Sequence, residues 1–197
     1  MNGDLTKVST REEQKEQRKQ AILEAGLKLF VRNGYNATKI SDIAKEVNMS
    51  VGLLFHYFES KEKLYEELVR IGLSGTQMAM DYNKDNPLLF FEKTASGIFK
   101  YIKENPTIAR MFVLMGQANH NEAAPQIIKD LMSQVNNITL SVPLIEAGQK
   151  IGSIKEGNPL SLSTAFWCSI QGIAEELAMH TDTPCPDSDW IVDILRK

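Results

Sequence analysis

Apolar residues recur at intervals of three and four along almost the whole chain, which is the spacing that places them on one face of an α-helix. The first such run consists of Ile22, Ala25, Gly26, Leu29 and Phe30. Thr10 and Glu13 match a capping box, in which each side chain bonds the other residue's backbone N–H. Gly34 accepts the conformation that ends a helix. The pattern therefore predicts a first helix between Thr10 and Gly34, and an all-α fold for the whole chain.

Two short helices are predicted to follow, joined by a tight turn. The apolar positions of the first short helix are Ile40, Ile43, Ala44 and Val47. Thr38 is the residue expected to cap it, because a threonine hydroxyl can accept a bond from a backbone N–H at a helix start. Asn48 interrupts the apolar pattern and tolerates the left-handed backbone conformation, so we expect it to form the turn.

The second short helix is expected to span residues 51 to about 57, with Ser50 as its cap. Leu54 and Phe58 lie four positions apart and are predicted to face the protein interior. The residues left on the outward side are Val51, Gly52, Leu53, His56 and Tyr57. A fourth helix, capped by Ser60, is expected to bury one apolar face. The residues of that face are Leu64, Leu68 and Ile71.

The rest of the chain keeps the helical spacing and is divided by prolines and glycines. Further helices are predicted over residues 87–104, 106–118, 125–150, 159–179 and 187–197. Pro143 is expected to kink the long helix at 125–150, because proline removes one backbone hydrogen bond and crowds the preceding turn. These signals predict an N-terminal domain over residues 1–59, with a charged N-terminal extension, and a helical domain over residues 60–197.

Charge is distributed unevenly between the two parts of the chain. Hydrophobic residues make up 43% and charged residues 24% of the 197 residues, an ordinary composition for a globular protein. The net charge is −3, but residues 1–63 carry 11 basic and 9 acidic residues, whereas residues 64–197 carry 11 basic and 16 acidic. A mildly basic N-terminal part suits contact with phosphates, whose neutralisation releases counterions.

Several other classes of protein are disfavoured by the sequence. The polar N-terminus does not resemble a signal peptide, and no stretch reaches the roughly 18 apolar residues that a membrane helix needs. We therefore expect a cytoplasmic protein with no membrane partner. Cys168 and Cys185 are expected to be reduced thiols. His120 and His180 lack partners at ligand spacing, so no metal or cofactor site is predicted. Because no G-x-S-x-G or Walker motif occurs, an enzyme is not expected.

Residues 38–61, TKISDIAKEVNMSVGLLFHYFESK, have the pattern of a helix-turn-helix, in which the second helix enters the major groove of DNA. Small residues at the start of that helix allow close approach to the bases. Leu53 is an apolar side chain suited to the methyl group of thymine. Tyr57 and Lys61 carry a hydroxyl and an ammonium that suit phosphate oxygens. Contacts of this kind orient a protein on DNA without reading the sequence.

Residues 18–68 resemble the DNA-binding domain of the tetracycline-repressor (TetR) family. The resemblance includes the segments AGLKLFVRNGYNATKISDIA and MSVGLLFHYFESKEKL. The positions that match the family pattern are Met49, Ser50, Gly52, Leu54, Phe55, Tyr57, Phe58, Lys61 and Leu64. The resemblance implies an all-α homodimer with a three-helix DNA-binding head, a fourth helix as a link, and a helical body that holds a small effector. Residues 159–179 and 187–197 would build the dimer.

The resemblance also implies which residues contact DNA. They are Thr38, Lys39, Ser41, Ser50, Val51, Gly52, Leu53, His56, Tyr57 and Lys61. Phe55 stands where the family often has tyrosine, and Val51 and Leu53 stand where polar or basic residues are common. We therefore expect contacts to the bases that are more apolar than usual. His56 is open to two interpretations, as a phosphate contact or as a solvated surface residue.

The family resemblance predicts a repressor that binds double-stranded DNA at a palindromic operator and is released by a small-molecule effector. Candidate effector-binding residues are Phe90, Phe99, Met111, Phe112, Met115 and Trp167. Aromatic and methionine side chains at helical spacing are also typical of an ordinary core, and both interpretations stay open. The alternative function is an all-α metabolite-binding bundle or enzyme with a vestigial helix-turn-helix. An adaptor protein without salt-dependent DNA affinity is a third class.

Overall fold

A computed structural model describes residues 10–77 and 86–197 of the protein. Within these residues every regular element is a helix, and the one β-type pairing is an isolated antiparallel bridge between Ile154 and Arg196. The all-α fold expected from the sequence is thus confirmed. Of the charged N-terminal extension, residues 1–9 lie outside the described residues.

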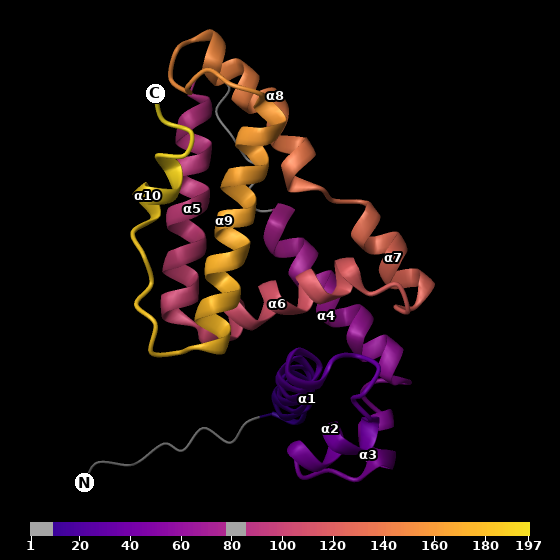
Figure 1. The fold of residues 1–197 in the computed structure, drawn as a ribbon. Helices are drawn as coiled ribbons and strands as arrows, with labels where there is room; N and C mark the ends of the chain where they lie inside the picture. Colours follow the sequence, from indigo (N-terminus) through magenta and orange to yellow (C-terminus); the bar gives the residue numbers. More distant parts are fainter. Residues whose placement is uncertain (1–9, 78–85) are drawn as a thin grey trace, which may run out of the picture. The chain divides into compact units, whose positions relative to one another are not determined.

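The chain forms two compact units, and the boundary between them lies between Tyr65 and Glu66. This boundary falls inside helix α4 (Lys61–Gln77), whose first turn belongs to unit 1 and whose remainder belongs to unit 2. Figure 1 labels α1, α2 and α3, which belong to unit 1, and α5 to α10, which belong to unit 2.

Helix α1 (Arg11–Asn33) begins at the predicted capping box. The backbone N–H of Glu13 donates to Thr10 Oγ1 at 3.2 Å, and the backbone N–H of Thr10 donates to Glu13 Oε2 at 2.8 Å. Gly34 ends the helix with a φ of 79°, a value that glycine adopts without strain because it has no Cβ. Both predicted ends of the first helix are confirmed.

The turn between α2 (Ile40–Glu46) and α3 (Val51–Phe55) forms as predicted. Asn48 takes a left-handed conformation with a φ of 52°, which reverses the chain between the two short helices. Ser50 then caps α3, because its Oγ accepts the backbone N–H of Leu53 at 3.1 Å.

The prediction that Thr38 caps α2 is wrong. Its hydroxyl donates instead to the carbonyl oxygens of Leu29 at 3.1 Å and Gly34 at 2.8 Å. These carbonyls belong to the end of α1, where helix geometry leaves the last acceptors without partners. Lys39 occupies the N-cap position of α2, and the carboxylate of Asp42, inside the first turn, accepts the Lys39 backbone N–H at 3.2 Å.

Helix α3 is shorter than predicted and ends at Phe55 instead of about Tyr57. The backbone N–H groups of His56 and Tyr57 donate to carbonyl oxygens only three residues earlier, at 3.2 and 2.9 Å. This tighter winding closes the helix. Leu54 is fully buried and Phe58 is 6% exposed, so the predicted inward face of the helix is confirmed.

Three aromatic rings fill the core of unit 1. The ring of Tyr65 lies 5.1 Å from that of Phe30 and 4.5 Å from that of Tyr35, measured between centroids, and each such pair adds about 0.5–1.5 kcal/mol beyond its buried area. A Cβ on Gly26 would lie 3.0 Å from Leu64 Cδ2, so α1 and the start of α4 pack closely there. Burial raises the pKa of Tyr65 to about 12, because desolvation disfavours the phenolate.

Helix α4 begins where the sequence predicts, since Ser60 Oγ accepts the backbone N–H of Lys63 at 3.2 Å. Leu68 is buried as expected, but Ile71 is 43% exposed and its predicted place on the inner face is wrong. The buried side of the helix continues instead through Leu73.

Residues 86–197 form the six remaining helices. Their bounds are α5 (Pro87–Glu104), α6 (Pro106–His120), α7 (Gln126–Ser133), α8 (Asn137–Lys150), α9 (Pro159–Met179) and α10 (Ser188–Val192). Helices α5 and α9 occupy the predicted residues, and α6 extends two residues further than expected. Helices α5, α8 and α9 lie side by side in unit 2 (Figure 1).

The core of unit 2 forms where these helices meet. Its buried residues include Phe90, Phe91, Phe99, Leu144, Ile145, Phe166 and Ile170. The rings of Phe91 and Phe166 meet edge to face, with centroids 5.0 Å apart. A Cβ on Gly148 would lie 2.5 Å from Ile154 Cδ1, so the segment after α8 folds back tightly onto that helix.

The single long helix predicted over residues 125–150 is wrong. The chain breaks after Ser133, and α8 begins afresh with Asn136 as its cap, whose Oδ1 accepts the backbone N–H of Thr139 at 3.2 Å. Pro143 lies inside α8 on its exposed side. A capping asparagine therefore divides this stretch, whereas the proline lies within a helix that continues past it.

The last predicted helix, over residues 187–197, shortens to α10 with five residues. Beyond it, Leu195 is fully buried, and its carbonyl accepts the backbone N–H of Lys155 at 2.9 Å. Arg196 pairs with Glu92 at 3.1 Å. Pairing with a distant segment thus replaces the expected final turns, and it fixes the C-terminal residues to α5 and to the loop after α8.

Two glycines on α4 offer a matched test of packing inside unit 2. A Cβ on Gly72 would lie 2.5 Å from Met115 Sδ and 2.9 Å from Met115 Cγ, whereas no described atom comes within 4 Å of one on Gly75. Both Gly→Ala changes gain helix propensity of up to about 1 kcal/mol.

We expect Gly75→Ala to raise the free energy of unfolding and Gly72→Ala to lower it, because Met115 must be displaced. Urea denaturation followed by circular dichroism measures both variants. Equal stabilisation by the two changes would contradict the close approach of α6 to α4.

Candidate nucleic-acid interface

The outward side of α3 is an exposed surface of small and apolar residues. Leu53 is 38% exposed and Phe55 is 44% exposed, and Gly52 and His56 are also exposed. They are held in this position because Leu54, on the opposite side of the helix, is fully buried. Of the other residues predicted to contact DNA here, Ser50 is exposed and Val51 and Tyr57 are half-buried.

The start of α2 lies at one side of this helix-turn-helix. Lys39 and Ser41, both predicted to contact DNA, are exposed there. Thr38 is 1% exposed, and its hydroxyl is already bonded to carbonyls at the end of α1. Its side chain therefore positions the segment ahead of α2.

Lys61 also acts inside unit 1. Its Nζ donates to the carbonyl oxygens of Tyr35 and Thr38, both at 2.9 Å, and it stands 4.3 Å from the centroid of the Tyr35 ring. Two of the three N–H donors of the ammonium are used in this way, and the position over the ring adds a cation–π attraction. Lys61 thus ties the chain between α1 and α2 to the first turn of α4.

Tyr35 and Glu62 form a second link between the chain after α1 and the first turn of α4. The Tyr35 hydroxyl donates to Glu62 Oε1 at 3.0 Å. Burial raises the pKa of Tyr35 well above its usual range, and the hydrogen bond to Glu62 adds to the shift. The pKa of Glu62 is lowered by bonds from its own backbone N–H and from Ser60. At neutral pH the pair therefore consists of a neutral donor and a charged acceptor.

A third tie joins α1 to α2 at the surface. Lys28 Nζ lies 2.6 Å from Glu46 Oε1, and the hydrogen bond from Lys28 lowers the pKa of Glu46. Because both side chains are largely exposed, solvent screens this pair, and it contributes little to stability. Lys45, one residue before Glu46, is exposed.

The predicted effector-binding residues lie in unit 2 and fall into two groups. Phe90 and Phe99 are 5% and 2% exposed, as core residues are. The half-buried members are Met111, Phe112, Met115 and Trp167, which come from α6 and α9.

Polar groups lie close to this second group. The Trp167 indole N–H donates to Ser141 Oγ at 2.9 Å, and Gln171 Nε2 donates to the Phe112 carbonyl at 2.9 Å and to Glu175 Oε1 at 2.6 Å. A Cβ on Gly116 would lie 2.9 Å from Glu175 Oε1, so α6 and α9 approach closely where the glutamine and glutamate lie.

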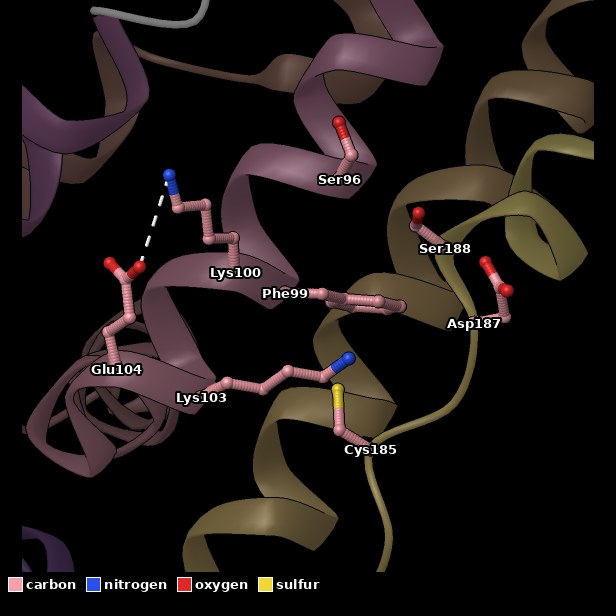
Figure 2. A pocket seen from close by; sticks show the side chains of 8 residues that line it. All are labelled: Ser96, Phe99, Lys100, Lys103, Glu104, Cys185, Asp187 and Ser188. Atoms are coloured by element: carbon pink, nitrogen blue, oxygen red, sulfur yellow. Dashed lines mark ion pairs between the residues drawn. The ribbon is translucent and has the colours of Figure 1, made fainter.

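A hollow of about 510 Å³ lies between α5 and the segment that leads to α10. Figure 2 shows its lining: Ser96, Phe99, Lys100, Lys103, Glu104, Cys185, Asp187 and Ser188. Of the six predicted effector residues, Phe99 alone lines this hollow. Two basic and two acidic side chains balance the charge of its lining. Burial raises the pKa of the Cys185 thiol despite Lys103 nearby, so the thiol is protonated at neutral pH.

Two further findings concern other classes of site. In the described parts of the chain no cluster of three or more histidine, cysteine, aspartate or glutamate side chains is arranged to hold a metal ion. No helix in the same residues has the length and apolar character needed to cross a membrane.

The N-terminal part of the chain matches a known protein family. The sequence model of the family described as "Bacterial regulatory proteins, tetR family" matches residues 22–68, which include α2, α3 and the first turns of α4. The uncharacterized HTH-type transcriptional regulator YhgD of Bacillus subtilis (strain 168) is 28% identical over 144 residues, covering 72% of this chain and 74% of YhgD.

Two other proteins are similar over shorter or more divergent stretches. IcaR of Staphylococcus aureus (strain Newman), a negative transcriptional regulator of the biofilm operon icaADBC, is 34% identical over 70 residues, or 34% of this chain and 38% of IcaR. AibR, whose structure was solved with isovaleryl coenzyme A and operator DNA, has a TM-score of 0.64 at 17% identity. The match covers 89% of this chain and 94% of AibR. At this identity the likeness establishes the fold.

Replacing Lys61 tests its internal role. Lys61→Met keeps the aliphatic stem but removes the ammonium from the carbonyls of Tyr35 and Thr38, so we expect unit 1 to lose about 1–3 kcal/mol of unfolding free energy. Lys45→Met is the matched control, because Lys45 is exposed on α2. Urea denaturation of both variants measures the difference. If they lose equal stability, Lys61 does not hold the turn.

Proposed function

The chain belongs to the TetR family of bacterial transcriptional regulators, and from this premise we propose that it represses transcription by binding a palindromic operator as a homodimer from which a small molecule releases it. DNA binding belongs to unit 1, the part that the family's sequence model matches.

The observation that carries the proposal is the outward presentation of α3. A helix-turn-helix inserts its second helix into the major groove, which requires that helix to be anchored from behind and open in front. Leu54 and Phe58 anchor α3, whereas Gly52, Leu53 and His56 are exposed. Small residues at the helix start allow the backbone to come close to the base edges.

Contacts to the DNA backbone would come from the edges of the same surface. We assign them to the exposed Lys39 and Ser41 at the start of α2 and to the Tyr57 hydroxyl after α3. Such contacts fix the orientation of the protein on the duplex. Thr38 and Lys61 take positioning roles in this proposal, because their polar groups are bonded inside unit 1.

The dimer interface is assigned to the outer sides of α8 and α9. On α8, Leu140 is 49% exposed and Ile151, just after the helix, is 61% exposed, and both lie on one side of the helix. On α9, small uncharged residues occupy the outer side over three turns. These residues are Ser161, Thr164, Ala165, Cys168 and Gly172. An apolar, closely approachable surface of this kind suits a second copy of the same helix pair.

This assignment differs from the dimer expected from the sequence. The second dimer helix was placed at residues 187–197, but α10 has five residues, and Ile191 and Val192 are buried in unit 2. Two copies of unit 1 in such a dimer would reach successive major grooves, with recognition helices about 34–36 Å apart.

Repression and release by an effector are supported by similar proteins. IcaR is described as a negative regulator, and AibR was solved with a coenzyme A thioester and operator DNA. For this chain we place the effector beside Met111, Phe112, Met115 and Trp167, the half-buried members of the predicted set. Met115 packs against Gly72 of α4, and α4 continues into unit 1. A coupling of about 1–3 kcal/mol would weaken operator binding about 5–150-fold.

DNA binding is tested with Lys39→Ala in a mobility-shift titration on the DNA upstream of this protein's own gene. The wild-type dimer should bind with an affinity that falls steeply as salt rises. If Lys39 contacts a phosphate, Lys39→Ala should weaken binding and reduce the slope of log affinity against log salt by about 1.

Lys129→Ala is the control, because Lys129 is exposed on α7 in unit 2. This variant should retain the wild-type slope. Absence of salt-dependent binding by the folded wild-type protein would overturn the proposed function, and an unchanged slope in Lys39→Ala would remove Lys39 from the contact set.

The dimer is tested by placing a large charged side chain on α9. Gly172→Arg should convert the dimer to a monomer, because the charge would be buried between two copies of the helix. Gly97→Arg on α5 is the matched control, since a Cβ at either glycine meets no described atom within 4 Å. Analytical ultracentrifugation measures both. A dimer in both variants would contradict the assigned interface.

A further inference from the structure

The helix that carries DNA recognition in the proposed function has an unusual composition. Helix α3 consists of Val51, Gly52, Leu53, Leu54 and Phe55, all without a polar side chain. Residues 49–58 contain no arginine, lysine, asparagine, glutamine, aspartate or glutamate. These are the side chains that form the strongest hydrogen bonds to guanine, adenine and cytosine in the major groove. Recognition by α3 must therefore depend mainly on another kind of contact.

Two large apolar side chains of α3 are open to solvent. Leu53 is 38% and Phe55 is 44% exposed, although Leu54 between them is fully buried. Two residues along a helix correspond to a rotation of about 200°, so Leu53 and Phe55 lie on opposite flanks of the outward side. Gly52 and His56 lie between them. Gly52 has no Cβ, and no described atom comes within 4 Å of the place one would take.

Thymine is the base whose major-groove edge carries an apolar group, the C5 methyl. A leucine or phenylalanine side chain gains free energy by covering a methyl group and gains nothing comparable from the polar edges of the other bases. When α3 approaches the groove through Gly52, Leu53 and Phe55 lie on either side of it. The two side chains would therefore reach different base pairs.

We propose that Leu53 and Phe55 determine operator specificity by covering thymine methyl groups, so that each half-site requires thymine at two positions in the major groove. The inference rests on the proposed function and specifies the DNA that it selects. Hydrogen bonding to bases falls mainly to His56 and Ser50. The Ser50 hydroxyl can donate to DNA while its oxygen accepts the backbone N–H of Leu53.

The test removes single methyl groups from the DNA. Binding sites are first selected from random duplex DNA with the full-length dimer, and each thymine of the selected half-site is then replaced by uracil, which differs from it only at C5. We expect uracil to lower the affinity about fourfold at two positions, the effect of leaving about one methyl group uncovered. Uracil in the flanking DNA should have no effect.

Protein variants then identify the side chain that covers each methyl group. Leu53→Ala should abolish the sensitivity to uracil at one of the two positions and Phe55→Ala at the other. Both side chains are exposed, so the truncations leave the core of unit 1 filled. Ile71→Ala removes an equally exposed apolar side chain from α4 and should leave both sensitivities intact.

The outcomes separate the inference from the function on which it rests. Selection of a defined site that tolerates uracil at every thymine would overturn the inference and leave DNA binding in place. The same holds if uracil lowers affinity equally in the wild type and in both alanine variants. Failure to select any DNA sequence would overturn the proposed function itself.

Discussion

The burial of Leu54 is the constraint on which the recognition surface depends. Helix α3 has five residues, too few to be stable in isolation, and it stays in place because Leu54 is fully buried and Phe58 follows it into the core of unit 1. A helix anchored on one side must expose its opposite side. The exposure of Gly52, Leu53 and His56 is therefore a direct consequence of how α3 is held.

Polar groups tie the turn that leads into α2 to the end of α1 and the start of α4. Lys61 donates to the carbonyls of Tyr35 and Thr38, and the Thr38 hydroxyl donates to carbonyls at the end of α1. These bonds satisfy backbone acceptors that would otherwise be costly to bury. In unit 1, side chains of the types that suggest phosphate contacts thus also serve the fold.

Local signals in the sequence predicted most of unit 1. The capping box of Thr10 and Glu13, the left-handed turn at Asn48 and the Ser50 cap involve residues within a few positions of one another, so the sequence contains all the information that they need. The family resemblance predicts DNA contacts for Thr38 and Lys61, and the ammonium of Lys61 also suits a phosphate oxygen. Their partners, carbonyls as far as 26 residues away, are set by the packing of helices and cannot be identified from spacing.

The errors in the helices predicted for unit 2 have similar causes. Apolar residues continue across the break between α7 and α8, so their spacing does not reveal that Asn136 caps a new helix there. The end of the chain has helical spacing, yet Leu195 pairs with Lys155 across 40 positions. The effector residues were chosen by type and spacing alone, which do not distinguish a core side chain such as Phe99 from a half-buried one such as Met111.

In the proposed complex, DNA covers the outward side of α3. The most direct measurement is methyl NMR of the leucine-labelled dimer during titration with duplex DNA from upstream of its gene. We expect the Leu53 methyl signals to shift strongly, while those of Leu131, which is buried in α7, change far less. DNA binding that leaves the Leu53 signals unchanged would contradict it.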